Sequence, residues 1–451
     1  MAAGAVAAAD TLSSPSWVGE ALDGSGPWLL RSKAPWLIGL LMLFDSWDSV
    51  VIAYTLPVLI GQWQLSPLQA GSLISAGYGA QFLGAIVFGS LAERYGRLPI
   101  LKSLVGVMSV LAIACSMAAS YNQLIILRAL QGLAIGGALP VAICYINEVA
   151  PTATRGRFFG TFQFLMTSGF GLAALSGAFL IPSFGWRVMF AIGAAPLLVL
   201  PFTLTLPESP RWLAGRGRTD EAAKSLERLG CGAVPPANAR PPIPGSGEKV
   251  PYAMLFARDV RNTSIVTALL WFLTSLVSFG LVTWIPSIYV SMFKIPVADA
   301  LRYNIIVAIS IFILPIFLRQ TIDRIGRRPP PMFGTAIGGL ALLTMIFING
   351  NATILLVGLA IVGQIGISIG SMVLWPYTAE TYPTRIRSLA LGTSSSVARA
   401  ASMLTPLLVG GVMQATGSVT LVFLVFGLAS VAVALLWRFG VRETAGRKMV
   451  D

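Results

Sequence analysis

The sequence predicts an all-α polytopic membrane protein in which twelve transmembrane helices form two six-helix, pseudo-symmetric halves. Three observations support this prediction: an apolar composition, twelve long apolar segments, and a charged loop pattern that occurs twice. The 451-residue chain is 55% hydrophobic and only 11% charged, whereas a soluble domain is about 25% charged. Lipid is therefore the expected solvent for much of the surface.

The apolar segments that can cross a bilayer, which takes about 20 residues, fall into two sets of six. They lie near 35–60, 68–90, 98–119, 122–147, 157–182 and 187–206, and near 263–291, 298–320, 330–348, 351–380, 386–413 and 416–440. We therefore expect a flexible N-terminal tail (1–34), a first half (35–206), a central loop (207–262), a second half (263–440) and a C-terminal tail (441–451). In the central loop, a short amphipathic helix is predicted after Thr219 and a proline-rich linker over 234–246.

A charged loop pattern follows the second span of each half. Residues 89–99 read G-S-L-A-E-R-Y-G-R-L-P and residues 319–329 read R-Q-T-I-D-R-I-G-R-R-P, at an offset of 230. At an offset of 232, Tyr145, Glu148, Pro151, Thr152 and Arg155 match Tyr377, Glu380, Pro383, Thr384 and Arg387. Two ordered matches at nearly one offset indicate a duplicated unit, and membrane proteins built from parallel repeats are typically transporters.

The repeated loops can act as a conformational latch. A carboxylate at a helix end can stabilise the start of a neighbouring helix, arginines can pair with carboxylates across the cytoplasmic face, and glycine permits the sharp turn. The latch residues are Gly89, Glu93, Arg94, Gly96, Arg97, Glu148 and Arg155 in the first half, and Asp323, Arg324, Arg327, Glu380 and Arg387 in the second. The alternative, ordinary arginine-rich cytoplasmic loops, does not account for the repeat.

The distribution of Lys and Arg predicts the orientation in the membrane. The loops near 61–67, 119–121, 349–350 and 414–415 carry neither residue, whereas the alternate loops and both chain ends carry most of them. Because basic residues favour the cytoplasmic side, we expect cytoplasmic termini and a cytoplasmic central loop in a bacterial inner membrane. The net charge of +13 then reflects orientation rather than nucleic-acid binding, and we expect a monomer.

The repeated loops, the twelve spans and the central loop together resemble the major facilitator superfamily over roughly residues 35–440. Glu93 stands where the family usually has Asp, and the second copy of the pattern lacks the leading Gly. The stretch P-E-S-P-R-W-L (207–213) and the Glu148…Arg155 spacing are similar to its sugar-porter and organic-acid branches. The resemblance implies a transporter whose two halves rock around a central site.

Four charged residues fall inside predicted spans, where a charge costs from ~3 to more than ~10 kcal/mol. They are Asp45 and Asp48 in the first span, Arg128 in the fourth and Arg399 in the eleventh. Asp45 and Asp48 are i, i+3 neighbours and so share one helix face. Burial and a like charge favour a protonated carboxyl, whereas a nearby arginine favours the ionised one, so the pair can exchange a proton. The alternative is a purely structural pair locked to Arg128.

Residues 44–48, F-D-S-W-D, resemble the D-G-x-D signature of aromatic acid:proton symporters, with Ser46 where Gly is usual. The resemblance implies a proton-coupling role for Asp45 and Asp48, with Arg128 opposite one of them. The sequence leaves open which carboxylate Arg128 meets. The alternative for Arg128 is a helix-end side chain that extends outward to the interface.

Arg399 is the main indication of the sign of the substrate. No Asp or Glu occurs between Glu380 and Glu443, so a partner of Arg399 is not local. Its guanidinium can bind a carboxylate with two hydrogen bonds, and acid-transporting relatives carry an arginine in this region; the alternative is pairing with the first-span carboxylates. The other candidates for binding substrate, by hydrogen bonds or ring stacking, are Gln163, Gln364, Trp271, Trp375 and Tyr377.

These observations predict uptake of a small organic carboxylate, preferably aromatic, together with protons and without a cofactor. A sugar:proton symporter is one alternative, supported by residues 207–213 and opposed by Arg399. A drug or metabolite exporter is another, because the gradients set the direction. The chain lacks histidine, a nucleophile motif and a phosphate-binding loop, which argues against an enzyme. Its three cysteines have no paired spacing, so no metal site is expected.

Overall fold

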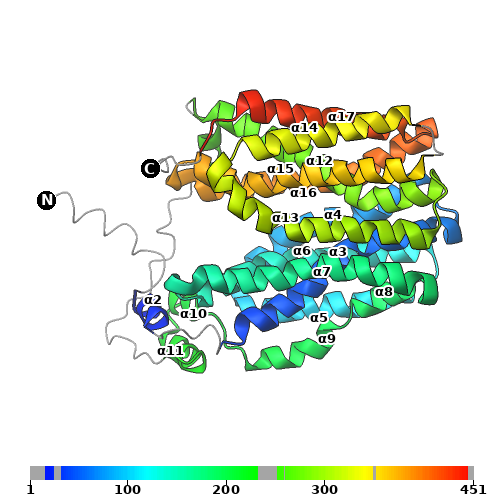
Figure 1. Cartoon of the computed structure of the whole chain (residues 1–451). Helices are drawn as coiled ribbons and strands as arrows, with labels where there is room; N and C mark the ends of the chain where they lie inside the picture. The colour runs from blue at the N-terminus through cyan, green and yellow to red at the C-terminus, as the bar shows by residue number, and fades with distance from the viewer. Residues whose placement is uncertain (1–15, 25–31, 232–250, 259, 349–351, 445–451) are drawn as a thin grey trace.

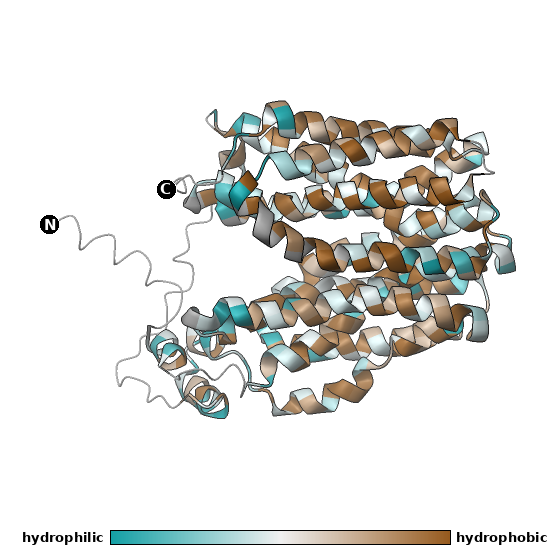
Figure 2. Ribbon diagram, in the orientation of Figure 1, coloured by the Kyte–Doolittle hydropathy of each residue, from teal (hydrophilic) through white to brown (hydrophobic). Residues whose placement is uncertain are grey.

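The computed structural model describes residues 16–24, 32–231, 251–258, 260–348 and 352–444, and this part of the chain contains helices and no strand. Within it, twelve helices are long and apolar enough to cross a membrane, which confirms the predicted fold class. Figure 2 shows hydrophobic residues along the length of the bundle and hydrophilic residues mainly toward its two ends. The linker predicted over 234–246 lies outside the described residues.

The spans follow the predicted ranges closely. In the first half they are α3 (Ala34–Trp63), α4 (Pro67–Tyr95), α5 (Arg97–Ser116), α6 (Tyr121–Val149), α7 (Arg155–Phe184) and a broken sixth span made of α8 (Arg187–Ile192), α9 (Pro196–Val199) and a 3-10 segment (Leu200–Thr205). In the second half they are α12 (Arg261–Ser291), α13 (Val297–Ile325), α14 (Pro329–Thr344), α15 (Thr353–Thr381), α16 (Thr384–Thr416) and α17 (Thr420–Leu435).

Local sequence explains where several spans begin. The Ser66 side chain accepts a hydrogen bond from the Gln69 N–H, and the Gln69 side chain accepts one from the Ser66 N–H, so α4 begins with a capping box. Pro67 fills the first helical position, where its missing N–H costs nothing. Ser120 caps α6 in the same way through the Gln123 N–H.

Three short helices lie together at one end of the first half: α2 (Ser16–Asp23), α10 (Pro210–Gly215) and α11 (Thr219–Arg228) (Figure 1). We call this the basic end, since the turns with Arg97 and Arg327 lie there too. The amphipathic helix predicted after Thr219 is present as α11. The segment predicted to be a flexible tail instead contains α2, because its apolar residues recur at helical spacing and bury against the neighbouring helices: these are Trp17, Val18 and Leu22.

The apolar core differs between the two ends of the bundle. At the end opposite the basic end, one core runs through both halves and includes Leu59, Ile74, Leu281 and Val409. At the basic end each half has its own core: Leu41, Val105 and Phe158 belong to one, and Leu270 and Val373 to another. The two halves therefore share a core at the opposite end but not toward the basic end, where the rings of Phe164 on α7 and Phe312 on α13 still meet across the halves with centroids 5.8 Å apart.

Reciprocal close contacts between α4 and α16 join the halves at the opposite end. A β-carbon on Gly71 would collide with the Pro406 carbonyl oxygen, and a β-carbon on Gly410 would collide with the Pro67 carbonyl oxygen. Each helix thus contributes a Pro-x-x-x-Gly segment whose glycine fits against the other's proline. Only glycine permits such an approach of two backbones.

Candidate functional site

Asp45 on α3 and Arg399 on α16 lie in different halves but close enough for their charges to interact. Each is the charged group whose field acts on the other. The Asp45 side chain is 4% exposed, and among the described residues no group donates a hydrogen bond to its Oδ1. The described residues also form no direct hydrogen bond or ion pair to Arg399. The guanidinium thus has its countercharge nearby while its donors stay free.

Asp45 in the first half and Arg399 in the second lie at the same level along the length of the bundle. Asp45 lies between Met42, in the core of the first half, and Trp47, in the joined core. Arg399 lies between Ala398, which packs on the core of the second half, and Ala401, in the joined core. These two charges therefore lie where the joined core ends and the separate cores of the halves begin.

Asp48 and Arg128 form a second charged pair, one turn deeper on α3. Asp48 is fully buried and Arg128 is 2% exposed. The Arg128 Nη2 donates to the Asp48 backbone oxygen at 3.2 Å, and its Nη1 donates to the Gln131 Oε1 at 2.6 Å. Of the two carboxylates that the sequence left open, the structure brings Arg128 to Asp48, and the arginine lies inside the bundle rather than at its surface.

The break in the sixth span lies against the Asp48 carboxylate. Between α8 and α9, a β-carbon on Gly193 would collide with the Asp48 Oδ1, so the absence of a side chain lets this backbone approach the carboxylate. The described residues form no hydrogen bond of ordinary length and angle to either carboxylate oxygen of Asp48, although the Gln131 side chain lies close enough to interact with it. The sequence analysis missed this contact, although a glycine three residues before Pro196 inside an apolar span was a usable signal.

Two tryptophans from different spans of the second half form an aromatic pair. The rings of Trp271 on α12 and Trp375 on α15 meet edge to face, with centroids 4.8 Å apart. The Trp271 Nε1 donates to the Thr378 Oγ1 at 3.0 Å, which fixes the buried ring. Trp375 is 53% exposed, so its face is free to stack on another ring.

The remaining predicted substrate residues bond within their own helices or pack in a core. The Gln364 Nε2 donates to Ser368 and the Gln163 Nε2 to Thr167, each at 3.3 Å. The Gln364 Oε1 is buried and accepts no hydrogen bond from the described residues. Tyr377 is 2% exposed and packs against the Trp437 ring at 5.1 Å, which is a packing position.

Two latch arginines form ion pairs within their own halves. Arg97 pairs with Glu148 at 3.2 Å, and Arg327 pairs with Glu380 at 3.1 Å. The Nε atoms of Arg155 and Arg387 are buried and donate no hydrogen bond to the described residues. Among the described residues, the other predicted latch residues form no ion pair. The Glu93 backbone oxygen accepts a hydrogen bond from Trp212, and Arg94 lies over the Tyr95 ring. Gly89 has open space around it, Arg324 is exposed, and the Asp323 side chain lies outside the described residues.

Two carboxylates that the sequence analysis did not select complete the latch. The Leu98 N–H donates to Glu208 at 3.1 Å, and the Arg327 N–H donates to Glu443 at 2.8 Å, so each glutamate caps the third span of its half. Gly96 and Gly326 precede these spans with φ of 113° and 103°. The offset from Glu208 to Glu443 is 235 (443 − 208), unlike that of the two loop patterns, so the repeat did not reveal them.

Burial raises the pKa of Glu208 above its ordinary value of 4.5. Hydrogen bonds from the backbone N–H groups of Ser209, Leu98 and Arg97 act in the opposite direction but do not cancel the effect of burial. The capping carboxylate of the first half is therefore a titratable group outside the spans. The ionised form that the cap favours is the one that burial disfavours.

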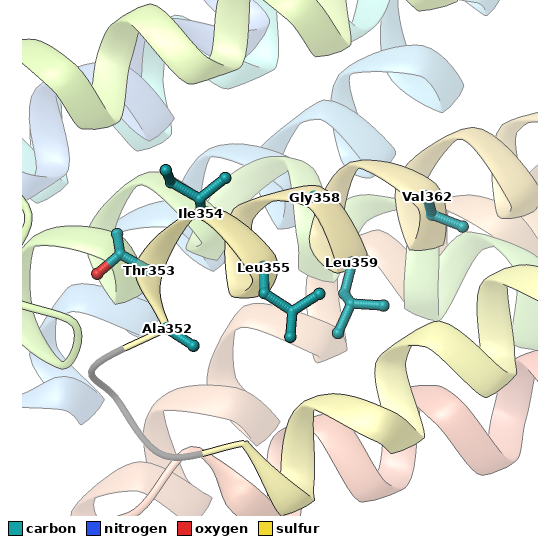
Figure 3. A pocket seen from close by; sticks show the side chains of 7 residues that line it. All are labelled: Ala352, Thr353, Ile354, Leu355, Gly358, Leu359 and Val362. Atoms are coloured by element: carbon teal, nitrogen blue, oxygen red, sulfur yellow. The ribbon is translucent and has the colours of Figure 1, made fainter.

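An apolar hollow on the outer side of α15 lies apart from these charges (Figure 3). It is lined by Ala352, Thr353, Ile354, Leu355, Gly358, Leu359 and Val362, at the start of α15 and hence at the opposite end. Its lining contains no charged side chain. Among the described residues, no group of three or more Cys, Asp or Glu could hold a metal ion. The charges between the halves therefore remain the candidate site.

Comparison with known proteins agrees with this arrangement. The family model described as "Sugar (and other) transporter" matches residues 38–451. The chain belongs to this family of the major facilitator superfamily. It is thus an integral multi-pass membrane transporter of small molecules, not an enzyme. The fold is similar to that of the xylose transporter XylE from E. coli, whose structure was solved in an inward-open conformation, with a TM-score of 0.70 at 20% identity over 92% of this chain and 97% of that one.

The transporter has relatives whose names specify organic acids. It is 29% identical to the niacin transporter NiaP of Acinetobacter baylyi over 92% of this chain and 94% of that one. It is 28% identical to the gallate transporter of Pseudomonas putida over 93% of each chain. It is also 27% identical to the benzoate transport protein of Acinetobacter baylyi, over 83% of this chain and 82% of the relative.

Proposed function

We propose that this transporter takes up a small aromatic carboxylate together with one or more protons. The observation that carries the proposal is that Asp45 and Arg399, one in each half, act on each other electrostatically while the guanidinium has no direct hydrogen-bond partner among the described residues. A guanidinium binds a carboxylate with two parallel hydrogen bonds. Arg399 is thus the group that would hold the substrate anion.

Competition for one guanidinium would couple substrate to proton. Without substrate, the charge of Arg399 favours the ionised form of Asp45. When a substrate carboxylate binds Arg399, it neutralises that charge and adds a second anion nearby, and both effects favour protonation of Asp45. The site then carries an acid and a proton together. Moving one negative charge inward against ~100 mV costs about 2.3 kcal/mol, which one proton offsets and further protons exceed.

The aromatic part of the proposal rests on Trp375 and on the relatives. An exposed tryptophan face that is braced by Trp271 can stack on a flat substrate ring, worth about 0.5–1.5 kcal/mol beyond the buried area. Niacin, gallate and benzoate, which name three relatives, are all aromatic carboxylates. A third relative from Acinetobacter baylyi is named for cis,cis-muconate, which extends the class to an unsaturated acid without an aromatic ring.

The proposed setting is a monomer in a bacterial inner membrane, with both termini and the central segment in the cytoplasm. The basic residues at the basic end support this orientation. In that orientation the joined core lies on the outer side and the separately packed halves face the cytoplasm. The structure then corresponds to an inward-facing state, in which substrate and proton would be released.

The proposal is tested by uptake of labelled benzoate, nicotinate and gallate into proteoliposomes under an imposed pH gradient. We expect accumulation that disappears when the gradient is collapsed, and that is lost in Asp45→Asn. The matched control is Asp299→Asn, which removes an exposed carboxylate paired with Arg302 at the opposite end. Accumulation of sugars but not of acids, or acid uptake that is indifferent to the gradient, would overturn the proposal.

A further inference from the structure

One turn of α4, residues 77–79, contacts α3, which carries Asp45 and Asp48, and also contacts two helices of the second half. Tyr78, 8% exposed, donates a hydrogen bond from its Oη to the Ser49 backbone oxygen at 3.2 Å. Its ring meets the Phe279 ring of α12 edge to face, with centroids 5.5 Å apart. The next residue, Gly79, leaves only 3.0 Å between its β-carbon position and the Met403 sulfur of α16. This turn therefore connects α3 to two helices of the other half.

The same turn lies against Arg128. A β-carbon on Gly77 would lie 3.7 Å from the Arg128 Nη2, and the charge of Arg128 acts on Tyr78. Arg128 donates to the Asp48 backbone oxygen and Tyr78 to the next one, that of Ser49. Two adjacent carbonyls of α3 thus receive one side-chain donor each, and a movement of Arg128 relative to Asp48 displaces the acceptor of Tyr78.

Phe279, which Tyr78 contacts in the second half, lies on a tightly packed part of α12. A β-carbon on Gly280, next to Phe279, would collide with the Phe426 ring of α17, so α12 packs tightly at this level. Met403 lies one turn beyond Arg399 on α16, toward the opposite end. A displacement of Tyr78 therefore acts on a tightly packed interface, which alternating access would require to be either closed or open and which would then be the two-state element that coupling requires.

We infer that Tyr78 is a positioning residue that connects the Asp48–Arg128 pair to closure of the two halves at the opposite end. The inference rests on the proposed proton-coupled transport and adds Asp48 as a second group that exchanges a proton, beside Asp45. When the Asp48 carboxyl gains or loses its proton, Arg128 changes its distance from it and the turn of α3 at residues 48–49 shifts. The Tyr78 hydroxyl carries that shift to Phe279. Without the hydroxyl, the halves open and close independently of the charge on Asp48.

The charged and titratable groups near this path come from several packed helices. They are Asp45, Asp48 and Tyr54 from α3, Cys115 from α5, Arg128 from α6, and Arg399 from α16 through Asp45. Tyr54 offers a matched control for Tyr78. It is a buried tyrosine on a neighbouring helix, and its hydroxyl forms no hydrogen bond with the described residues.

The experiment compares Tyr78→Phe, Tyr54→Phe and Phe279→Leu with the unmodified transporter by hydrogen exchange as a function of pH. The reporters are the opposite-end segments 67–71 and 406–410, where α4 meets α16. Because the intrinsic rate of amide exchange itself rises with pH, each rate is divided by the intrinsic rate at that pH, and exchange here means this corrected value. We expect it to change with pH in these segments in the unmodified protein and in Tyr54→Phe. In Tyr78→Phe this pH dependence should shrink about threefold to tenfold, the range that one hydrogen bond supports. Phe279→Leu should raise exchange at every pH.

A transport measurement separates positioning from mere packing. Tyr78→Phe keeps the ring, so substrate exchange between two compartments at equal pH should persist, whereas accumulation driven by a pH gradient should fall. Unchanged pH dependence of exchange in Tyr78→Phe, or no pH dependence in the unmodified protein, would overturn the inference even if symport is found. Failure of acid uptake in the unmodified protein would overturn the proposed function and leave the exchange result to decide the role of Tyr78.

Discussion

Asp45 and Arg399 are each other's charged partner across two halves of the molecule that share no covalent contact near them. Each lies at the level where the joined core ends. Two opposite charges in this place differ from a structural ion pair within one helix bundle, because any rocking of the halves changes the distance between them. Substrate affinity and conformation are therefore expected to depend on the same two charges.

The first prediction concerns the affinity for acids. Arg399→Gln removes the positive charge but keeps a hydrogen-bonding side chain of similar length. Because hydrogen bonds to charged groups contribute about 1.5–3 kcal/mol, we expect the dissociation constant for benzoate to rise about 10-fold to 150-fold, measured by calorimetry on the purified protein. Arg302→Gln, at an exposed arginine, should leave it unchanged. Equal affinity in Arg399→Gln would remove Arg399 from the site.

The second prediction concerns the buried pair of Asp48 and Arg128. Removing one member of a buried pair leaves an uncompensated charge, which costs roughly 3–5 kcal/mol. Arg128→Gln should therefore lower the free energy of unfolding by about that amount, and adding Asp48→Asn should restore most of it. The measurement is chemical unfolding in detergent of the two single variants and the double variant. Additive losses in the double variant would show that the two side chains do not interact.

The third prediction follows from the raised pKa of Glu208. In the window above the ordinary value of 4.5, the folded protein binds more protons at this group than the unfolded chain, so stability falls as pH rises toward the folded pKa. Glu208→Gln keeps an acceptor for the N–H groups of α5 but does not titrate. We expect its melting temperature to decline less than that of the unmodified protein as pH rises through this window.

A matched comparison isolates the titration of Glu208. Glu221→Gln removes a carboxylate that is ion-paired with Arg218 and exposed, and that has its pKa lowered mainly by the hydrogen bond from Arg218. This second variant should not reduce the decline above pH 4.5. If Glu208→Gln and the unmodified protein melt in parallel across the whole range, the carboxyl group of Glu208 does not contribute to the pH dependence.

Much of the architecture was accessible from the sequence, because span length, repeated loops and basic-residue bias are local properties. The twelve spans were predicted from the length of the apolar segments. The pairs Arg97–Glu148 and Arg327–Glu380 consist of residues that the repeated loop pattern had identified. The deeper parts of the site were not accessible. Nothing in the linear sequence states that the break at Gly193 reaches Asp48, because that contact depends on how the sixth span packs against the first.

The partners of the central charges show the same limit. The sequence showed that Arg399 lacks a local acidic partner, but it left open whether substrate or a first-span carboxylate meets it. The structure places Asp45 near Arg399 without a direct hydrogen bond. This arrangement is compatible with Arg399 binding Asp45 at one step of the transport cycle and the substrate at another. Glu208 and Glu443 were missed because their 235-residue offset and different flanking residues hide an equivalence that exists only in space.

The fourth prediction concerns closure at the opposite end. Gly71 and Gly410 let α4 and α16 approach so closely that a β-carbon on either would collide with the facing proline carbonyl, of Pro406 or Pro67. Gly71→Leu or Gly410→Leu should therefore hold this end open, favour the outward-facing state in the proposed orientation, and abolish transport while preserving folding. Gly411→Leu is the matched control, because Gly411 has open space around it and its variant should transport normally.

Distance measurements between spin labels would follow this closure directly. Gly61→Cys on α3 and Ala415→Cys on α16 are exposed positions at the opposite end, one in each half; Cys144, which is also exposed, is first replaced by Ser. The distance should lengthen in Gly71→Leu and Gly410→Leu and stay short in Gly411→Leu. The two backbones must move apart far enough to make room for the added leucine side chain, so a shift of several ångströms is expected. An unchanged distance together with lost transport would mean that the contact serves folding rather than gating.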